Sequence, residues 1–359
     1  MANILDYIAW RGDLSFEQDE FNEVDGLIFA ELCYLDFANG IPSYPSTDKT
    51  TLEKALNYLF SRVDSSKWVL GVILPQTIVT LGNSVQKANR FRKMKVSNYI
   101  NDVDIETSCQ FSAMCFHVSS KHIVIAFRGT DDTLIGWQEN LNMSHKFPVP
   151  AQEKAAEYVD RIAKLFPNSK FTIVGQSKGG NLAVHGAIYC DDNNKDRILK
   201  AYSYDGQGFR KNNIDENKYK LIKSKIVKVL PQNSLVGCIF DDYYGKQIVA
   251  HSKNRGMMQH DSFSWDVLQN RFVLAKNGLE SNSKKFNKEL NEFLDGLTNE
   301  QLNDLADNVY NFIIELNRNT LLEVQADPLR FLTLLSKIKY KNRKLFTKFI
   351  NILIKNKML

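Results

Sequence analysis

The pattern of apolar and polar positions divides the chain into three regions. Residues 1 to about 105 are expected to be mostly helical, and the sequence from about 281 to the end is again helical, without strand candidates. The middle region alternates short apolar runs with stretches of helical spacing; its strand candidates are residues 109–118, 122–130, 171–174, 201–206, 225–231 and 246–252. Strands that alternate with helices indicate an α/β fold class with a mostly parallel sheet covered on both faces. We therefore expect a main domain over 1–280, which includes a helical N-terminal segment over 1–105, and a helical extension over 281–359.

One stretch, KFTIVGQSKGGNLAVHGAIYC, joins a strand candidate directly to a helix. Only glycines and one serine lie between the two, in the pattern G-x-S-x-G, with Ser177 between Gly175 and Gly179. So tight a turn holds its central residue in a strained conformation, and glycines are needed on both sides because side chains there would collide. A G-x-S-x-G turn between a strand and a helix predicts a nucleophile elbow. The alternative is a glycine-rich turn that binds a phosphate or nothing, but the pattern matches neither common nucleotide-binding motif.

Composition limits the class of protein. The apolar content of 43% and charged content of 24% are ordinary for a globular protein, and five scattered cysteines without a C-x-x-C pair argue against a disulfide framework or a zinc site. The sequence has no apolar signal core and no apolar run near the roughly 20 residues of a membrane span. We expect a cytoplasmic protein that needs no metal or organic cofactor.

A serine nucleophile needs a base, which is usually a histidine oriented by a carboxylate. In an α/β-hydrolase the chain order is serine, acid, histidine, and this order leaves His251 and His260. His185 follows Ser177 too closely on the elbow helix to turn back to it. His260 lies in a loop after the last strand candidate, where this fold delivers its base, so it is the favoured residue. His251 falls within or just after a strand, where a core or surface role is more usual.

The acid has several candidates. Asp205 ends the first strand after the elbow helix and is followed by glycines, which favours a catalytic role over a simple turn-capping role. Asp242 lies in what resembles an exposed turn, and Asp261 is adjacent to His260, so that its side chain should point away from the ring. We favour Asp205 and keep Asp242 and Asp261 as alternatives.

Two donors are expected to form an oxyanion hole. One is the backbone N–H of Lys178, directly after the nucleophile, and the other is Thr130, at the start of the loop after the strand IVIAF. The Lys178 side chain has two interpretations: it favours an anionic substrate, or it is an exposed lysine without a role.

These segments also resemble known families. IAFRGTDDTLIGW with TIVGQSKGGNLA resembles the fungal-type (class 3) lipases, and the whole pattern, with SYDGQGF, LPQNSLVG and MMQHDSFSW, is similar to a bacterial lipase-like family of unknown function. The resemblance covers about residues 20 to 300. It implies an α/β-hydrolase fold in which Ser177 is the nucleophile, His260 the base, and Thr130 with Lys178 the oxyanion donors. Where those lipases carry the acid, this chain has Asn233 and Ser234; SYDGQGF instead resembles the pancreatic-type lipases, which favours Asp205.

The sequence therefore predicts a serine acyl hydrolase acting on a small-molecule or lipid ester, although thioesters and peptides also fit. The alternative is a catalytically inactive binding module on a hydrolase fold, because no carboxylate stands at Asn233–Ser234. The oligomeric state cannot be predicted from these patterns.

The C-terminal segment is strongly basic. Residues 330–359 hold nine of the 46 Lys and Arg residues and no acid, which leaves 37 basic and 41 acidic groups in the rest of the chain. Its apolar residues have helical spacing, from Phe331 to Leu353. We expect either helices that pack on the main domain or an amphipathic helix that holds the protein on an anionic membrane surface. Nucleic acid is not expected, because the segment has no recognised reader motif.

Overall fold

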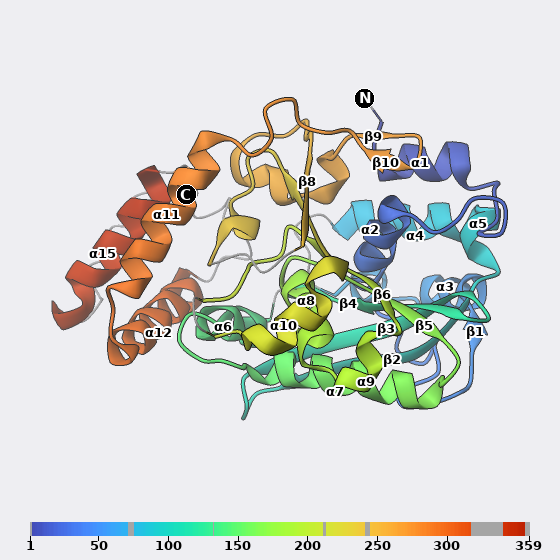
Figure 1. The fold of residues 1–359 in the computed structure, drawn as a ribbon, viewed down its shortest axis with the longest axis horizontal. Helices are drawn as coiled ribbons and strands as arrows, with labels where there is room; N and C mark the ends of the chain where they lie inside the picture. Colours follow the sequence, from blue (N-terminus) through green and yellow to red (C-terminus); the bar gives the residue numbers. More distant parts are fainter. Residues whose placement is uncertain are drawn as a thin grey trace.

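The computed structural model describes residues 2–70, 75–131, 133–210, 213–240, 245–316 and 340–355. Its centre is an eight-stranded sheet in the order β1-β2-β3-β4-β5-β6-β7-β8 (Figure 1). The strands are β1 (Thr50–Thr51), β2 (Lys95–Asp104), β3 (Cys109–Ser119), β4 (His122–Phe127), β5 (Lys170–Gln176), β6 (Ile198–Tyr204), β7 (Ile226–Pro231) and β8 (Lys246–Ala250).

The first four strands pair antiparallel, and β4 to β8 are parallel throughout. The parallel sheet expected from alternating strands and helices is thus confirmed, with an antiparallel extension at its β1 edge. The runs at 109–118 and 122–130 form the antiparallel pair β3–β4, joined by a short turn.

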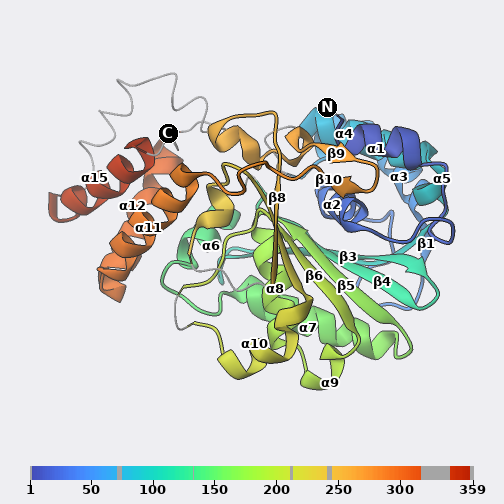
Figure 2. The ribbon, with the colours of Figure 1, turned by 45° about the horizontal axis from the view of Figure 1, so that its top comes forward.

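Helices cover both faces of the sheet, as Figure 2 shows. On one face lie the N-terminal helices, and on the other α7 (Pro150–Leu165), α8 (Lys178–Tyr189), α9 (Asp192–Lys195) and α10 (Glu216–Ile222). The alternation of side chains along β4 explains the two layers: Val124 and Ala126 join the core under the N-terminal helices, while Ile123 and Ile125 join the core under α7 and α8.

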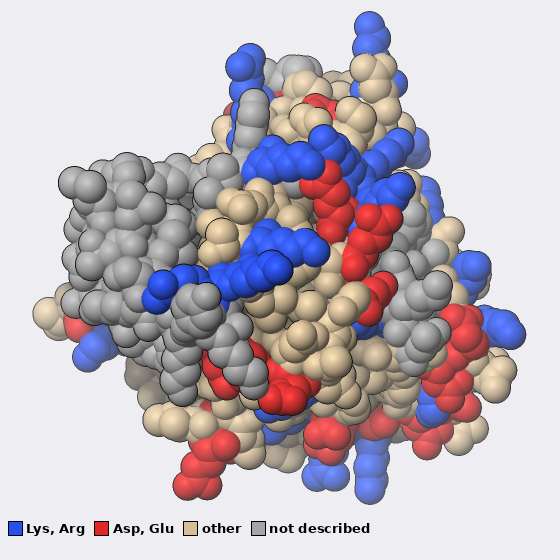
Figure 3. Space-filling view, turned by 90° about the vertical axis from the view of Figure 1, so that its left-hand side faces the viewer, with Lys and Arg blue, Asp and Glu red and all other residues tan. Residues whose placement is uncertain are grey.

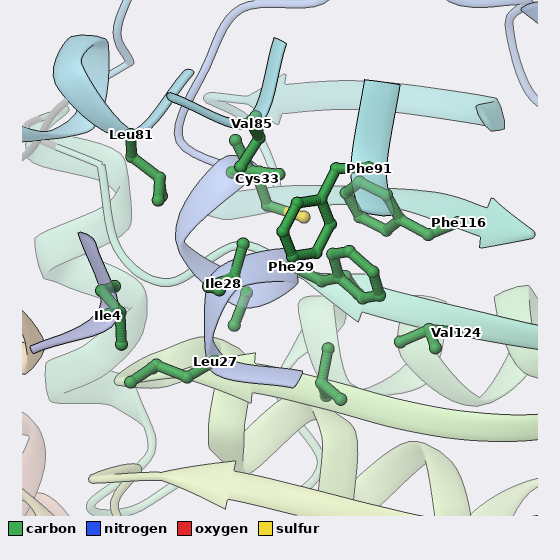
Figure 4. Close-up of a cluster of buried hydrophobic side chains, with 14 of the residues drawn as sticks. Ile4, Leu27, Ile28, Phe29, Cys33, Leu81, Val85, Phe91, Phe116 and Val124 are labelled. Carbon is green, nitrogen blue, oxygen red and sulfur yellow. The ribbon is translucent and has the colours of Figure 1, made fainter. Parts of the chain in front are cut away.

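The N-terminal layer holds α1 (Ile4–Arg11), α2 (Glu23–Leu32), α3 (Leu52–Ser61), α4 (Pro75–Lys87) and α5 (Asn89–Arg92). Helix α2 is buried along almost its whole length, and its Phe29 ring stacks on Phe116 of β3 with centroids 4.4 Å apart (Figure 4). The helical region ends at Arg92 and β2 begins at Lys95, earlier than the expected limit near 105, because residues 95–104 pair with β3.

The C-terminal extension forms a third cluster at one end of the molecule. Helices α11 (Ser281–Asp295), α12 (Asn299–Leu316) and α15 (Tyr340–Lys355) pack together and against α6 (Leu134–Asn142) and the short helix at 236–238. Phe346 and Ile350 of α15 are buried in this cluster, with Phe349 and Ile352 partly buried beside them. Where it is described, the basic segment therefore packs its apolar side on neighbouring helices, while residues 330–339 and 356–359 lie outside the described residues.

Within these ranges, no helix is both long enough and apolar enough to span a membrane.

Candidate active site

The turn between β5 and α8 has the geometry of a nucleophile elbow. Strand β5 ends at Gln176, α8 begins at Lys178, and Ser177 between them has φ 57° and ψ −130°. A Cβ atom on Gly175 would lie 2.1 Å from the Gly179 oxygen, and one on Gly179 would lie 2.2 Å from the Phe127 oxygen. Both glycines of the motif are thus required by close backbone contact, for the reason that the sequence suggested.

Ser177, His260 and Asp205 form one continuous chain of hydrogen bonds. His260 Nε2 lies 3.0 Å from Ser177 Oγ, and His260 Nδ1 lies 2.7 Å from Asp205 Oδ2. Three separate segments deliver them: the elbow after β5, the end of β6, and a short 3₁₀ helix over Gly256–His260 that follows β8. With Nδ1–H donating to Asp205, the neutral ring presents the Nε2 lone pair to the serine hydroxyl, which is the arrangement a general base requires.

The second carboxylate oxygen of Asp205 also has hydrogen-bond donors. Asp205 Oδ1 accepts hydrogen bonds from the Ser234 hydroxyl and from the Gly237 N–H, the latter at 3.2 Å. The carboxylate is buried, so these donors and His260 replace its lost hydration. Ser234 is one of the two residues, with Asn233, at the place where the resemblance to fungal lipases expects the acid. In this chain that position holds a hydroxyl that supports a carboxylate from the neighbouring strand.

The other candidates for base and acid lie elsewhere or have other partners. His251 Nδ1 pairs with Asp266 Oδ2 at 2.6 Å, away from the serine. Asp261 accepts a hydrogen bond from Phe263 N at 3.1 Å and so caps the next turn, and burial raises the pKa of its carboxyl. Asp242 lies outside the described residues.

The two expected oxyanion donors flank the elbow. Lys178 is the first residue of α8, so its N–H has no acceptor within the helix. The Thr130 hydroxyl accepts a hydrogen bond from Asn140 Nδ2 at 2.5 Å, which leaves its own hydrogen available to donate. The loop that carries Gly129 and Thr130 lies directly against the elbow, because a Cβ on Gly129 would be 2.7 Å from the Gln176 oxygen.

The Lys178 side chain matches neither of the two interpretations given to it. It is fully buried and forms an ion pair with Glu139, and its Nζ also donates to the Gln110 carbonyl at 2.7 Å. Burial lowers the pKa of Lys178, while the Glu139 carboxylate opposes this shift. Glu139 also accepts from the Ala151 N–H at 2.8 Å. The side chain therefore ties the elbow to α6, the helix behind the Thr130 loop, and does not face a substrate.

A second network behind His260 has no signal in the sequence. The Tyr34 hydroxyl donates to Gln176 Oε1 at 2.9 Å, and Gln176 Nε2 in turn donates to the His260 carbonyl at 3.3 Å. Glu31, one turn earlier than Tyr34, accepts from the Ser262 hydroxyl at 2.6 Å. The end of α2 thus holds the loop that carries His260 at two points. Residues so far apart in the chain show no local pattern that could have revealed this contact.

A family model described as Mbeg1-like matches residues 85–311, which is more than half of the chain. The chain belongs to the Mbeg1-like family. The matched span includes all four segments of the candidate site, at Thr130, Ser177, Asp205 and His260. No curated protein matches the sequence.

Solved lipases show a weak structural similarity to this chain. The M37 lipase has a TM-score of 0.36 and 10% identity, over 59% of this chain and 68% of that one. The Rhizomucor miehei lipase in its propeptide complex has a TM-score of 0.33 and 13% identity, over 59% and 61%. Lip2 lipase from Yarrowia lipolytica has a TM-score of 0.33 and 13% identity, over 62% and 76%. The mostly parallel eight-stranded sheet with helices on both faces, together with the strand–serine–helix turn at Ser177, gives this chain an α/β-hydrolase fold.

Proposed function

We propose that this protein is a serine acyl hydrolase that cleaves a carboxylic ester through an acyl-enzyme on Ser177. One observation carries the proposal: the unbroken hydrogen-bond chain from Ser177 through His260 to Asp205, with Ser177 at the tip of a strained turn. A serine hydroxyl is a weak nucleophile, and a base in contact with it has little structural purpose unless it removes the proton.

The mechanism follows from this geometry. Ser177 Oγ attacks the ester carbonyl carbon while His260 Nε2 takes the hydroxyl proton, and Asp205 stabilises the imidazolium that forms. The N–H of Lys178 and the donors of Thr130 hydrogen-bond to the oxyanion. As the tetrahedral intermediate collapses, His260 returns the proton to the departing alkoxide. Water, activated by the same histidine, then attacks the acyl-enzyme and releases the carboxylic acid and free Ser177.

The alternative of an inactive binding module has less support than the sequence suggested. That alternative rests on the absence of a carboxylate at Asn233–Ser234. Asp205 supplies a carboxylate from the end of β6, and Ser234 donates a hydrogen bond to it. A binding module would need neither the base nor the hydrogen-bonded acid.

A cytoplasmic location belongs to the same proposal. Cys33, Cys109, Cys115, Cys190 and Cys238 are all buried and free, which fits a reducing compartment.

The direct test is labelling with a fluorophosphonate probe, which reacts with activated serines. We expect the wild-type protein to be labelled and Ser177→Ala to be unlabelled, since alanine keeps the Cβ atom and with it the strained turn. Ser144→Ala, which removes a hydroxyl bound to the Leu141 carbonyl, is the matched control and should still be labelled. Folded wild-type protein that resists the probe, as judged by circular dichroism, would count against catalysis and favour the binding module.

A further inference from the structure

A polar cavity of about 600 Å³ lies outside the candidate active site, where the main domain meets the C-terminal helices. Its volume is within the range of small-molecule sites. The loop after β7, the loop after β8, the start of α11 and the end of α15 contribute to it, and Ser177 is not among the residues that line it.

Hydrogen bonds between side-chain amides and the backbone fix the floor of the cavity. Gln232 Nε2 donates to the Ser252 carbonyl at 3.0 Å, and Gln232 Oε1 accepts from the Ser252 N–H at 2.6 Å. Gln259 Oε1 accepts from Asn233 N at 2.8 Å. Leu235 is the single aliphatic side chain among the described lining residues, so the site does not suit an acyl chain.

Positive charge prevails around this floor. Lys253, Arg255, Lys285 and Lys355 line the cavity with only one carboxylate, Glu280, among the described lining residues. Figure 3 shows the side of the molecule that carries α11 and α15, where Lys and Arg side chains run in a band with acidic residues beside them.

Nearby carboxylates offset these cations only in part. Lys285 and Lys355 share Glu289, at 4.0 and 2.9 Å, and Lys253 lies 3.5 Å from Asp266, which already binds His251. The side chain of Arg255 has no ion pair or hydrogen bond with the described residues. Its guanidinium remains available to a ligand.

The N-terminus of helix α11 adds partial positive charge at the same cavity. Helix α11 begins at the cavity, through Glu280 and Asn282, and its N-cap residue Glu280 makes no side-chain capping bond. The carboxylate of the N-cap residue Glu280 offsets part of the positive charge at this terminus, while the first turn after it carries no acidic residue. The N–H groups of the first turn of a helix lack acceptors within the helix and carry partial positive charge, so they favour an anion.

We propose that this cavity binds a phosphate group, carried either by an anionic lipid headgroup or by a soluble phosphate ester. The Arg255 fork suits two phosphate oxygens, and the three lysines and the start of α11 line the same cavity. If the phosphate belongs to a lipid headgroup, this cavity is the place where the protein contacts the anionic membrane surface that the basic C-terminal segment predicts. The inference does not depend on the reaction at Ser177, because its readout is binding.

The soluble arm of the test uses inorganic phosphate, titrated calorimetrically at constant ionic strength against chloride. We expect the full-length protein to bind phosphate, and Arg255→Gln to weaken the affinity on the order of tenfold, as for loss of one charge-assisted hydrogen bond. The control is Lys288→Gln, which removes one charge from the same helix at an exposed lysine outside the cavity; it should change the affinity less than about twofold. If wild-type protein does not bind phosphate and also fails the vesicle arm, the proposal is wrong. It is equally wrong if the two variants lose affinity alike.

The second arm uses sedimentation with phosphatidylcholine vesicles that contain or lack phosphatidic acid. Binding that requires phosphatidic acid, is displaced by inorganic phosphate and falls in Arg255→Gln but not in Lys288→Gln identifies a lipid headgroup as the source. Binding of phosphate without binding to vesicles identifies a soluble ester. If vesicle binding falls equally in both variants, attraction is a property of the whole basic surface and the proposed site is overturned.

Discussion

Two residues of the candidate site have backbone conformations that non-glycine residues seldom adopt. Ser177 has φ 57° and Asp205 has φ 47°, and each follows the end of a neighbouring parallel strand. Such conformations cost on the order of 1–3 kcal/mol each and persist where the surroundings hold them. The Ser177 N–H is bound by the Tyr204 carbonyl and the Asp205 N–H by that of Val229, at 2.9 and 2.8 Å. The sheet edge thus fixes both residues so that their side chains converge on His260.

The role of Asp205 can be tested with a substitution that suits this backbone. Asparagine tolerates positive φ, so Asp205→Asn should keep the turn while removing the charge that orients His260. If Asp205 is the acid, we expect kcat on an activated ester to fall by about 10⁴, with an unchanged thermal midpoint.

Asp261→Asn is the matched control, since Asp261 caps its own turn. Near-normal activity in Asp205→Asn, with a large loss in Asp261→Asn, would assign the role to Asp261 instead.

At the scale of elements, α2 is both a core helix and a support of the site. Its buried residues pack on the central strands, while Glu31 and the following Tyr34 reach the loop of His260 through Ser262 and Gln176. A carboxylate buried in this way is costly when ionised, and burial raises the pKa of Glu31 to about 7. The neighbouring Asp261 acts in the same direction, and His260 opposes it.

Glu31 should therefore make folding stability depend on pH. Its folded pKa lies above its ordinary value, so its contribution is fully present below about pH 4.5 and is lost as the pH rises through 7. Glu31→Gln keeps an acceptor for Ser262 without the titration. Between pH 5 and 8 we expect the wild-type protein to lose up to about 3 kcal/mol in unfolding free energy relative to Glu31→Gln.

Urea unfolding at a series of pH values measures this difference. Glu17→Gln, at an exposed glutamate, should show the same pH dependence as the wild-type protein. A constant difference between the Glu31→Gln and wild-type curves would mean that Glu31 does not titrate in this range.

At the scale of the whole molecule, three apolar clusters meet around the sheet and its loops. Two of them lie on the faces of the sheet, and the third joins the C-terminal helices to Met143, Val149 and Leu235 of the main domain. The extension thereby belongs to the folded body in the described ranges. The lysines of the extension face outwards, and its apolar side is buried in the third cluster. Contact with an anionic surface would therefore depend on charge.

The packing of α15 predicts a stability effect. Phe346 is 1% exposed, and Phe346→Ala should weaken the attachment of the C-terminal helices by about 3–5 kcal/mol, because it leaves a cavity in the third cluster. Thr347→Ala, at an exposed position on the same turn, should have almost no effect. Limited proteolysis and thermal unfolding of both variants and the wild-type protein measure this effect. Equal protease resistance of Phe346→Ala and wild-type protein would show that α15 contributes little to the fold.

The features that the sequence determined are local or depend on chain order. The elbow could be read from Gly175, Ser177 and Gly179 because steric exclusion acts within a few residues. His260 followed from the order of elements, since a loop after the last parallel strand must lie at the carboxyl edge of the sheet. The parallel sheet followed from alternating apolar runs and helical spacing.

The tertiary structure alone decided which side chains support these residues. Lys178 pairs with Glu139, and Ser234 donates to Asp205, across 39 and 29 positions of the chain. Tyr34 reaches Gln176 across 142 positions. Such contacts leave no periodic signal, because they depend on how separate helices and loops pack on the sheet. The cavity beside Arg255 has the same origin: its four segments are remote in sequence, and only folding brings their charges to one place.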